Sequence, residues 1–190
     1  MKVYDLSREI MTTKPFEGDP APALNKIAKI DKDGYNLSTI SMSLHAATHA
    51  DAPLHFIKRG ADIASLPAEV FVGPCTVLTV PARRLDAMYF MRYDTKERLL
   101  LRGAGELTES GIGYLYNKGL KLIGTDRDSI GSPSDEQSVH LTLLAYKIAI
   151  LENLDMENVP DGDYLLCAAP LKIKGAEGAP CRAVLIDLEK

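Results

Sequence analysis

The chain has 190 residues, of which 46% are hydrophobic and 25% charged, and its net charge is −4 at pH 7. This length suits a single domain, 1–190, with a sizeable core, and the acidic balance argues against a nucleic-acid-binding protein. No apolar run is long enough to span a bilayer, the N-terminal residues lack the apolar region of a signal peptide, and the three cysteines are scattered. We therefore expect a cytoplasmic protein with neither nucleic-acid nor membrane partners.

Apolar runs recur along the chain between Gly and Pro residues and predict strands, and several of these runs are rich in Val, Ile and Leu and are predicted to be buried. The predicted strands are 3–6, 27–30, 37–43, 75–80, 98–101, 120–123, 164–168 and 183–188. One helix is predicted between the N-cap Thr108 and Gly119. A second is predicted over 139–151, where leucine and isoleucine recur at helical spacing. Many strands with few helices predict an α/β fold (mixed α+β), with helices packed outside the sheet layers. The last four residues, 187–190, are expected to be a solvated end.

Three of the four histidines lie within the short stretch 45–55, together with one aspartate. The potential ligands are His45, His49, Asp51 and His55, and imidazole and carboxylate are the usual ligands of Zn²⁺, Mn²⁺ or Fe²⁺. Pro53 disfavours a helix, so a turn or irregular loop is expected to aim these side chains at one point. The stretch therefore predicts a divalent metal site, with zinc as the first choice and manganese as the second.

The fourth histidine, His140, begins the second predicted helix, and Glu152 lies at its far end among apolar residues. A buried carboxylate needs a partner, so a metal or another cation is expected beside Glu152. Twelve residues of straight helix span roughly 18 Å. Either the helix therefore breaks before Glu152, or only one of the two residues binds the metal.

Several other polar residues admit two interpretations. Asp126 and Asp128 follow a predicted strand, where they either position a substrate or begin a turn, and Asp19 in Gly-Asp-Pro has the same alternatives. Thr48 is expected to donate a hydrogen bond to a ligating carboxylate or to the backbone. A serine nucleophile elbow and the zinc deaminase pattern are both absent from the sequence, which leaves metal-assisted chemistry as the stronger hypothesis.

The run from His45 to His55 resembles the H-x-G-T-H-x-D-x-P-x-H signature of the cyclase-like metal-dependent hydrolases, the family of bacterial kynurenine formamidase and isatin hydrolase. The likeness extends to 4–7, 17–20, 119–129, 150–153 and 160–183, and so covers nearly the whole chain. Two departures stand out. Ala47 replaces the glycine of the signature, and the chain has no tryptophan with which to surround an aromatic substrate.

The resemblance implies the family's swivelling β/β/α fold and a homodimer or homotetramer. It implies that His45, His49 and Asp51 bind one divalent ion. It also implies that Asp51 bridges to a second ion, held by His140 and Glu152, which requires the chain to bring those two residues to one site.

The resemblance further implies hydrolysis of the C–N amide bond of a small molecule by metal-activated water, with His55 as general acid and base. The expected substrate is an arylformamide such as N-formylkynurenine, or a cyclic amide. The expected substrate contacts are Phe16, Asp19, Asp126 and Ser129. The alternative is a non-catalytic metal-binding or interaction protein on the same fold, and His55 argues against it, since a structural site needs no additional imidazole.

Overall fold

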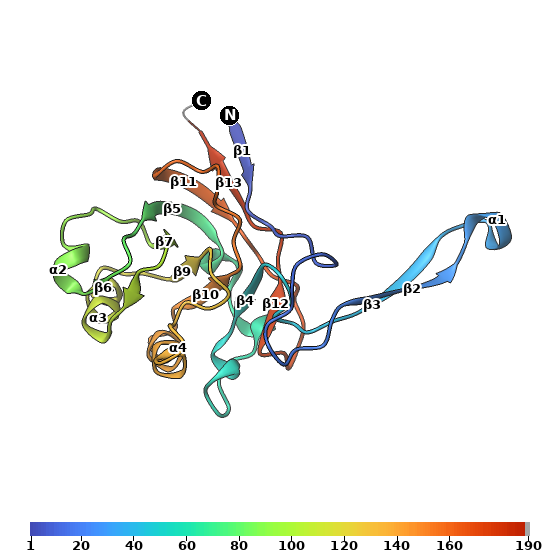
Figure 1. The fold of residues 1–190 in the computed structure, drawn as a ribbon, viewed down its shortest axis with the longest axis horizontal. Coiled ribbons are helices and arrows are strands. Elements are labelled where there is room, and N and C mark those ends of the chain that lie inside the picture. The colour runs from blue at the N-terminus through green and yellow to red at the C-terminus, as the bar shows by residue number, and fades with distance from the viewer. Residues whose placement is uncertain (189–190) are drawn as a thin grey trace.

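A curled, mixed β-sheet forms the body of the computed structural model, which describes residues 1–188 (Figure 1). Its strands are β1 (Lys2–Asp5), β4 (His49–Asp51), β5 (Val72–Thr79), β7 (Arg98–Arg102), β9 (Leu122–Thr125), β10 (Ala149–Glu152), β11 (Gly162–Cys167), β12 (Gly178–Pro180) and β13 (Val184–Asp187). They are ordered β1-β13-β11-β5-β7-β9-β10-β4-β12. The central strands β5, β7, β9 and β10 run parallel, and the strands on either side pair antiparallel.

Two hydrophobic cores cover the two faces of this sheet, because side chains alternate along each strand. In β7, Leu100 belongs to one core, whereas Leu99 and Leu101 belong to the other. The helices α2 (Ala87–Phe90), α3 (Glu109–Asn117) and α4 (Glu136–Ala145) pack on the face that holds Leu99 and Leu101. The opposite core joins side chains from Tyr4 of β1 to Ala179 of β12, at the two ends of the curled sheet. This arrangement confirms a mixed α/β fold.

Shorter elements complete the chain. Three single 3₁₀ turns, η1 (Pro53–His55), η2 (Ile63–Ser65) and η3 (Ala68–Val70), lie between β4 and β5, and β6 (Arg84–Leu85) pairs with β8 (Glu106–Leu107). None of the helices formed by residues 1–188 is long and apolar enough to cross a membrane. At the C-terminus, Asp187 ends β13 and is only 9% exposed, so the predicted solvated end begins at Leu188, and 189–190 lie outside the described residues.

The strands β2 (Ala23–Ala28) and β3 (Leu37–Ser41) form a separate hairpin with the short helix α1 (Ile30–Asp33) at its tip. Figure 1 shows this hairpin projecting away from the sheet. The strand predicted at 37–43 is confirmed as β3, although every residue of β3 is exposed. The strand predicted at 27–30 is only partly right, because β2 ends at Ala28 and Ile30 begins α1. Apolar residues indicate a strand without indicating what covers it.

The helix predicted after Thr108 is confirmed as α3, and the Thr108 hydroxyl accepts a hydrogen bond from the Gly111 backbone nitrogen at 3.2 Å. The helix predicted over 139–151 is wrong in its second half. The helix α4 ends at Ala145, Lys147 adopts a left-handed φ of 59°, and the chain continues as strand β10. The apolar spacing was misleading because two residues of the pattern, Ile148 in the turn and Leu151 in the strand, are buried in the cores on opposite faces of the sheet.

Candidate active site

The strands β4 and β10 bring one imidazole and two carboxylates, those of His49, Asp51 and Glu152, to one face of the sheet. Their antiparallel register sets Glu152 opposite His49 and Ile150 opposite Asp51. Since alternate residues share a face, all four point toward the helical layer, where Ile150 lies in the core. The stretch 45–55 is thus partly a buried strand, whereas a turn or irregular loop was expected.

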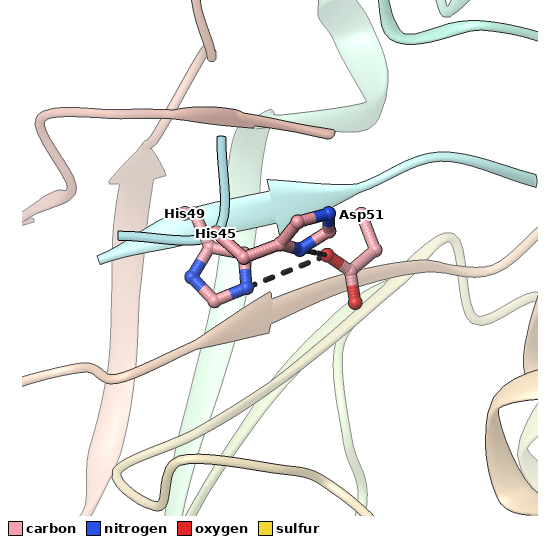
Figure 2. Close-up of side chains that lie close together, drawn as sticks. All are labelled: His45, His49 and Asp51. Carbon is pink, nitrogen blue, oxygen red and sulfur yellow. Dashed lines mark ion pairs between the residues drawn. The ribbon is translucent and has the colours of Figure 1, made fainter. Parts of the chain in front are cut away.

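The helix α4 packs on this same face and supplies His140, which is 1% exposed. Its Nε2 atom lies 3.1 Å from Oε1 of Glu152 and 3.6 Å from Oδ2 of Asp51. On the other side, Nε2 of His49 lies 3.5 Å from Oδ1 of Asp51 and 3.6 Å from Oε2 of Glu152. Figure 2 shows His45 and His49 beside Asp51, and Nδ1 of His45 lies 3.0 Å from Oδ1.

These side chains form two triads that share one carboxylate, namely His45–His49–Asp51 and Asp51–His140–Glu152. In a tetrahedral site with metal–ligand bonds of about 2.1 Å, the ligand atoms lie about 3.4 Å apart. The separations of 3.0 to 3.6 Å between nitrogen and oxygen atoms within the triads are therefore those of a site for a divalent ion. The structure thus brings together all five residues that the resemblance implied as metal ligands.

Backbone carbonyls fix the orientation of two of the imidazoles. Nδ1 of His49 lies 2.8 Å from the carbonyl oxygen of Ala47, and Nδ1 of His140 lies 2.8 Å from that of Glu136. When Nδ1 donates in a neutral imidazole, Nε2 carries the lone pair. Each Nε2 lone pair then faces carboxylate oxygens, and such a contact is attractive only when a proton or a cation lies between the two atoms.

Asp51 gives the strongest sign of an ion. Its carboxylate is fully buried, and the structure places imidazole nitrogens 3.0 to 3.6 Å from its two oxygens. A buried carboxylate is costly unless a cation, either a protonated imidazole or a metal ion, neutralises it. Glu152 is also buried, and its Oε1 accepts a hydrogen bond from the Ile130 backbone nitrogen at 2.8 Å. Two carboxylates and three imidazoles around one buried point therefore fit divalent metal binding.

The electrostatics of the metal-free site follow from this crowding. Burial raises the pKa of Glu152, and the neighbouring Asp51 carboxylate raises it further. Burial also opposes ionisation of Asp51, but hydrogen bonds from His140 and His45 outweigh it and lower the pKa of Asp51. For His140, burial favours the neutral ring, yet hydrogen bonds to Asp51 and Glu152 raise its pKa to about 10. Without a metal, the site is thus held together by protonated imidazole.

His55 lies beside the triads without belonging to either of them. It ends the turn η1, and its ring stacks on that of His45 with 4.2 Å between the ring centroids. Phe56 packs edge-on against the His55 ring, with the centroids 4.4 Å apart. Burial lowers the pKa of His55 to about 4, so its ring is neutral near pH 7 and able to accept a proton.

A cavity of about 250 Å³ opens over these residues. Phe16 and Asp19, both expected substrate contacts, line this cavity, whereas Ser129 lines an adjacent hollow. Asp126 does not line it, and its Oδ1 accepts a hydrogen bond from the Gly103 backbone nitrogen at 3.1 Å. The remaining lining residues are the triad members His45, His49, His140 and Glu152 together with His55, Phe56, Asp128, Glu136 and Asn153. Glu136 and Asn153 were not expected at the cavity from the sequence.

A hydrogen-bond network outside the cavity holds the backbone next to Glu152. The Thr48 hydroxyl donates to the carbonyl oxygen of Asn153 at 2.6 Å, and Nε of Arg8 donates to the same oxygen at 3.2 Å. Asn153 itself has a left-handed φ of 58°. Thr48 therefore bonds to the backbone, one of its two expected partners, whereas no sequence pattern pointed to Arg8.

Known proteins resemble this chain along most of its length. A family model described as "Putative cyclase" matches residues 4–105. The kynurenine formamidase of Maricaulis maris (strain MCS10) is 34% identical over 98% of this chain and 99% of its own, and that of Erythrobacter litoralis (strain HTCC2594) is 31% identical over 98% and 94%.

Solved structures share the fold. A potential metal-dependent hydrolase with cyclase activity has a TM-score of 0.81 at 28% identity, covering 97% of this chain and 96% of its own. Isatin hydrolase A from Labrenzia aggregata, solved with bound benzyl benzoate, has a TM-score of 0.79 at 23% identity, covering 97% and 93%. The second likeness concerns the fold alone.

Proposed function

Because the chain belongs to the putative cyclase family, we propose that it is a metal-dependent hydrolase that cleaves the C–N amide bond of a small molecule, as an arylformamidase does. The observation that carries this proposal is the pair of buried triads joined by Asp51, with the neutral imidazole of His55 beside them. A purely structural metal site would not need His55.

Two ions are proposed, one held by His45, His49 and Asp51 and the other by Asp51, His140 and Glu152. Imidazole and carboxylate ligands suit zinc, and manganese is the alternative because carboxylates also suit it. The chemistry that a divalent ion supplies at such a site is a lowered pKa of water and polarisation of a carbonyl oxygen. The protein contributes the orientation of the ligands, through the carbonyl groups that fix the His49 and His140 rings.

His55 is proposed to move the proton. As a neutral imidazole it takes a proton from the attacking water, and as imidazolium it gives that proton to the leaving nitrogen when the C–N bond breaks. Phe56 packs against the rings of both His55 and His140, with centroids 4.4 Å and 4.7 Å apart, and so limits their rotation. Covalent catalysis is not needed in this scheme.

The proposed substrate is an arylformamide such as N-formylkynurenine, because relatives named kynurenine formamidase match this chain over nearly its full length. The aromatic side chains Phe16 and Phe56 line the cavity and are suited to an aryl ring. A cyclic amide is the alternative substrate. The expectations of a cytoplasmic location and of a homodimer or homotetramer stay predictions.

The experiment is a hydrolysis assay on protein stripped of metal and then reloaded with zinc or manganese. N-formyl-L-kynurenine and isatin serve as parallel substrates. We expect the reloaded protein to hydrolyse the formamide and the stripped protein to be inactive. Equal activity of the two forms, or bound metal without hydrolysis of either substrate, would overturn the proposal.

A further inference from the structure

The imidazole of His45 is oriented differently from those of the other two histidines in the triads. His49 and His140 direct Nε2 toward carboxylate oxygens and Nδ1 toward backbone carbonyl oxygens. In His45 it is Nδ1 that faces a carboxylate, at 3.0 Å from Oδ1 of Asp51. The nitrogen of His45 that is directed into the triad is thus Nδ1, and when Nδ1 binds a metal, Nε2 carries the proton of the neutral ring.

The Nε2 atom of His45 lies beside a second carboxylate. This nitrogen is buried and forms no hydrogen bond with the residues that the structure describes, although Oε1 of Glu177 lies 3.5 Å away. A buried N–H group without an acceptor is costly. The separation is only about 0.3 Å beyond the usual range of an N–H···O hydrogen bond. Glu177 is therefore placed to accept the proton of Nε2 while Nδ1 faces the metal ligands.

The backbone holds Glu177 at this position. Glu177 directly precedes β12, in which Gly178 is paired with Asp51 of β4. The Ala52 backbone nitrogen donates a hydrogen bond to the carbonyl oxygen of Glu177 at 2.8 Å. The carboxylates of Asp51 and Glu177 thus lie at the two nitrogens of one imidazole, and the pairing of β4 with β12 fixes the backbone that carries both.

The His45 ring also fits closely against β12. A Cβ atom at Gly178 would lie 2.9 Å from Cε1 of His45 and 2.9 Å from the carbonyl oxygen of Ala50, which is closer than side-chain carbons approach such atoms. The ring therefore lies directly against the strand backbone, in space that only glycine leaves free. His55 stacks on the same ring, with the centroids 4.2 Å apart. These contacts restrict rotation of the ring and keep Nε2 beside Glu177.

We infer that Glu177 is a positioning residue for the metal, which accepts the Nε2 proton of His45 and so fixes Nδ1 as the ligating nitrogen. A carboxylate at the remote nitrogen of a metal-bound imidazole holds the ring in one tautomer and makes the ligating nitrogen more basic. Such partners contribute roughly 10- to 100-fold to metal affinity. Because the Glu177 side chain is 41% exposed, solvent weakens its effect, and we expect the lower end of this range. The inference rests on the metal site of the proposed function, but not on amide hydrolysis.

The first test measures zinc affinity by competition with a chelator in variants of the full chain. Glu177→Ala removes both the charge and the acceptor, so its zinc affinity should fall about tenfold. Glu177→Gln keeps an acceptor oxygen without the charge and should lose less. Glu157→Ala, a change at an exposed glutamate on the loop after β10, is the matched control and should bind zinc as the wild type does.

Nitrogen-15 NMR of the zinc-loaded wild type keeps the inference testable even if a variant misfolds. The His45 ring should show zinc on Nδ1 and a proton on Nε2 that exchanges slowly with water. In Glu177→Ala this proton should exchange faster, which a general role of Glu177 in folding would not require.

Two results would each overturn the inference: a proton on Nδ1 of His45 in the zinc-loaded wild type, or the same zinc affinity in Glu177→Ala as in the control. A wild type that binds no zinc would overturn both the inference and the proposed function. A zinc-loaded wild type that shows the expected His45 signals but hydrolyses no amide would support the inference and contradict only the proposed function.

Discussion

Nε2 of His140 lies 3.1 Å from Oε1 of Glu152, although the two residues are separated by twelve positions in the sequence. A straight helix would hold them roughly 18 Å apart. The chain instead turns at Lys147 and returns as β10, which carries Glu152 back under α4. This reversal completes the second triad, so its contribution to metal binding can be measured separately.

We expect Glu152→Gln to weaken zinc binding by more than about 100-fold, because it replaces a charged ligand in a buried site. The rise in melting temperature on adding zinc should be largely lost as well. Zinc titration calorimetry and thermal unfolding check both effects. Glu157→Gln, a change at an exposed glutamate on the loop after β10, is the control and should bind zinc normally. Unchanged zinc affinity in Glu152→Gln would remove Glu152 from the ligands.

Metal binding should release protons. In the metal-free protein, burial lowers the pKa of His140 but hydrogen bonds to Asp51 and Glu152 outweigh it, and the pKa is raised to about 10. Only the neutral imidazole binds metal, so zinc near pH 8 should displace about one proton from this ring, and affinity should rise toward pH 10. Calorimetry in buffers of different ionisation enthalpy measures the proton, and binding without proton release near pH 8 would contradict this account.

The free energy of unfolding of the metal-free protein should fall as the pH rises, whereas the zinc affinity should increase. The pKa of His140 is raised from its ordinary value of 6.5 to about 10 in the folded protein. Protonation of this ring therefore stabilises the fold fully below pH 6.5, and this stabilisation is lost as the pH rises through about 10. Urea unfolding of the metal-free protein between these values should therefore show a falling free energy of unfolding. A His140→Gln variant should lack this part of the decline. The same slope in both proteins would assign the decline to other groups.

Ala47→Gly should stabilise the protein by about 1 kcal/mol, because Ala47 has a left-handed φ of 53° that glycine adopts without a Cβ clash. The neighbouring Ala46 does not have a positive φ. Ala46→Gly is thus the matched control and should lower stability by about 0.5–1 kcal/mol. Chemical unfolding of both variants checks the pair. A loss of stability in Ala47→Gly would mean that the methyl group contributes more by packing than its backbone strain costs.

The sequence predicted that the members of the first triad lie close together, and the structure places them so, because they are separated by only a few residues. His45, His49 and Asp51 needed only a turn followed by a short strand to meet. The second triad depends on the pairing of β4 with β10, about a hundred residues away, and no local periodicity encodes that register. The apolar spacing before Glu152 suits a helix and a turn followed by a strand equally well.

The many apolar runs in the sequence predicted the fold class, but they did not predict which of the segments are buried. The strands β5, β7 and β9 occur where Val, Ile and Leu predicted them, and they lie in the centre of the sheet. The same residue types at β2 and β3 are exposed on the projecting hairpin. Composition determines that a segment is extended and apolar, whereas the identity of its neighbours depends on the whole topology.

Two of the three cysteines, Cys75 and Cys181, should be inert. Cys75 is fully buried and burial raises the pKa of its thiol, and burial raises that of Cys181 to about 12. Iodoacetamide near pH 8 should leave both unmodified and hydrolysis intact, since thiolate is the reactive form. Peptide mass mapping of the modified sites and an activity assay check this, with urea-unfolded protein as the control in which both react. Rapid inactivation of the folded enzyme would point instead to a cysteine nucleophile.

The most direct test of the account measures metal content and formamide hydrolysis together in His49→Ala and His55→Ala. His49 belongs to a triad, whereas His55 lies beside the triads with a neutral ring. We expect His49→Ala to lose metal and activity together, and His55→Ala to keep its metal while its rate falls by about 10²–10⁴-fold. Full turnover in His55→Ala, or wild-type metal content and turnover in His49→Ala, would contradict it.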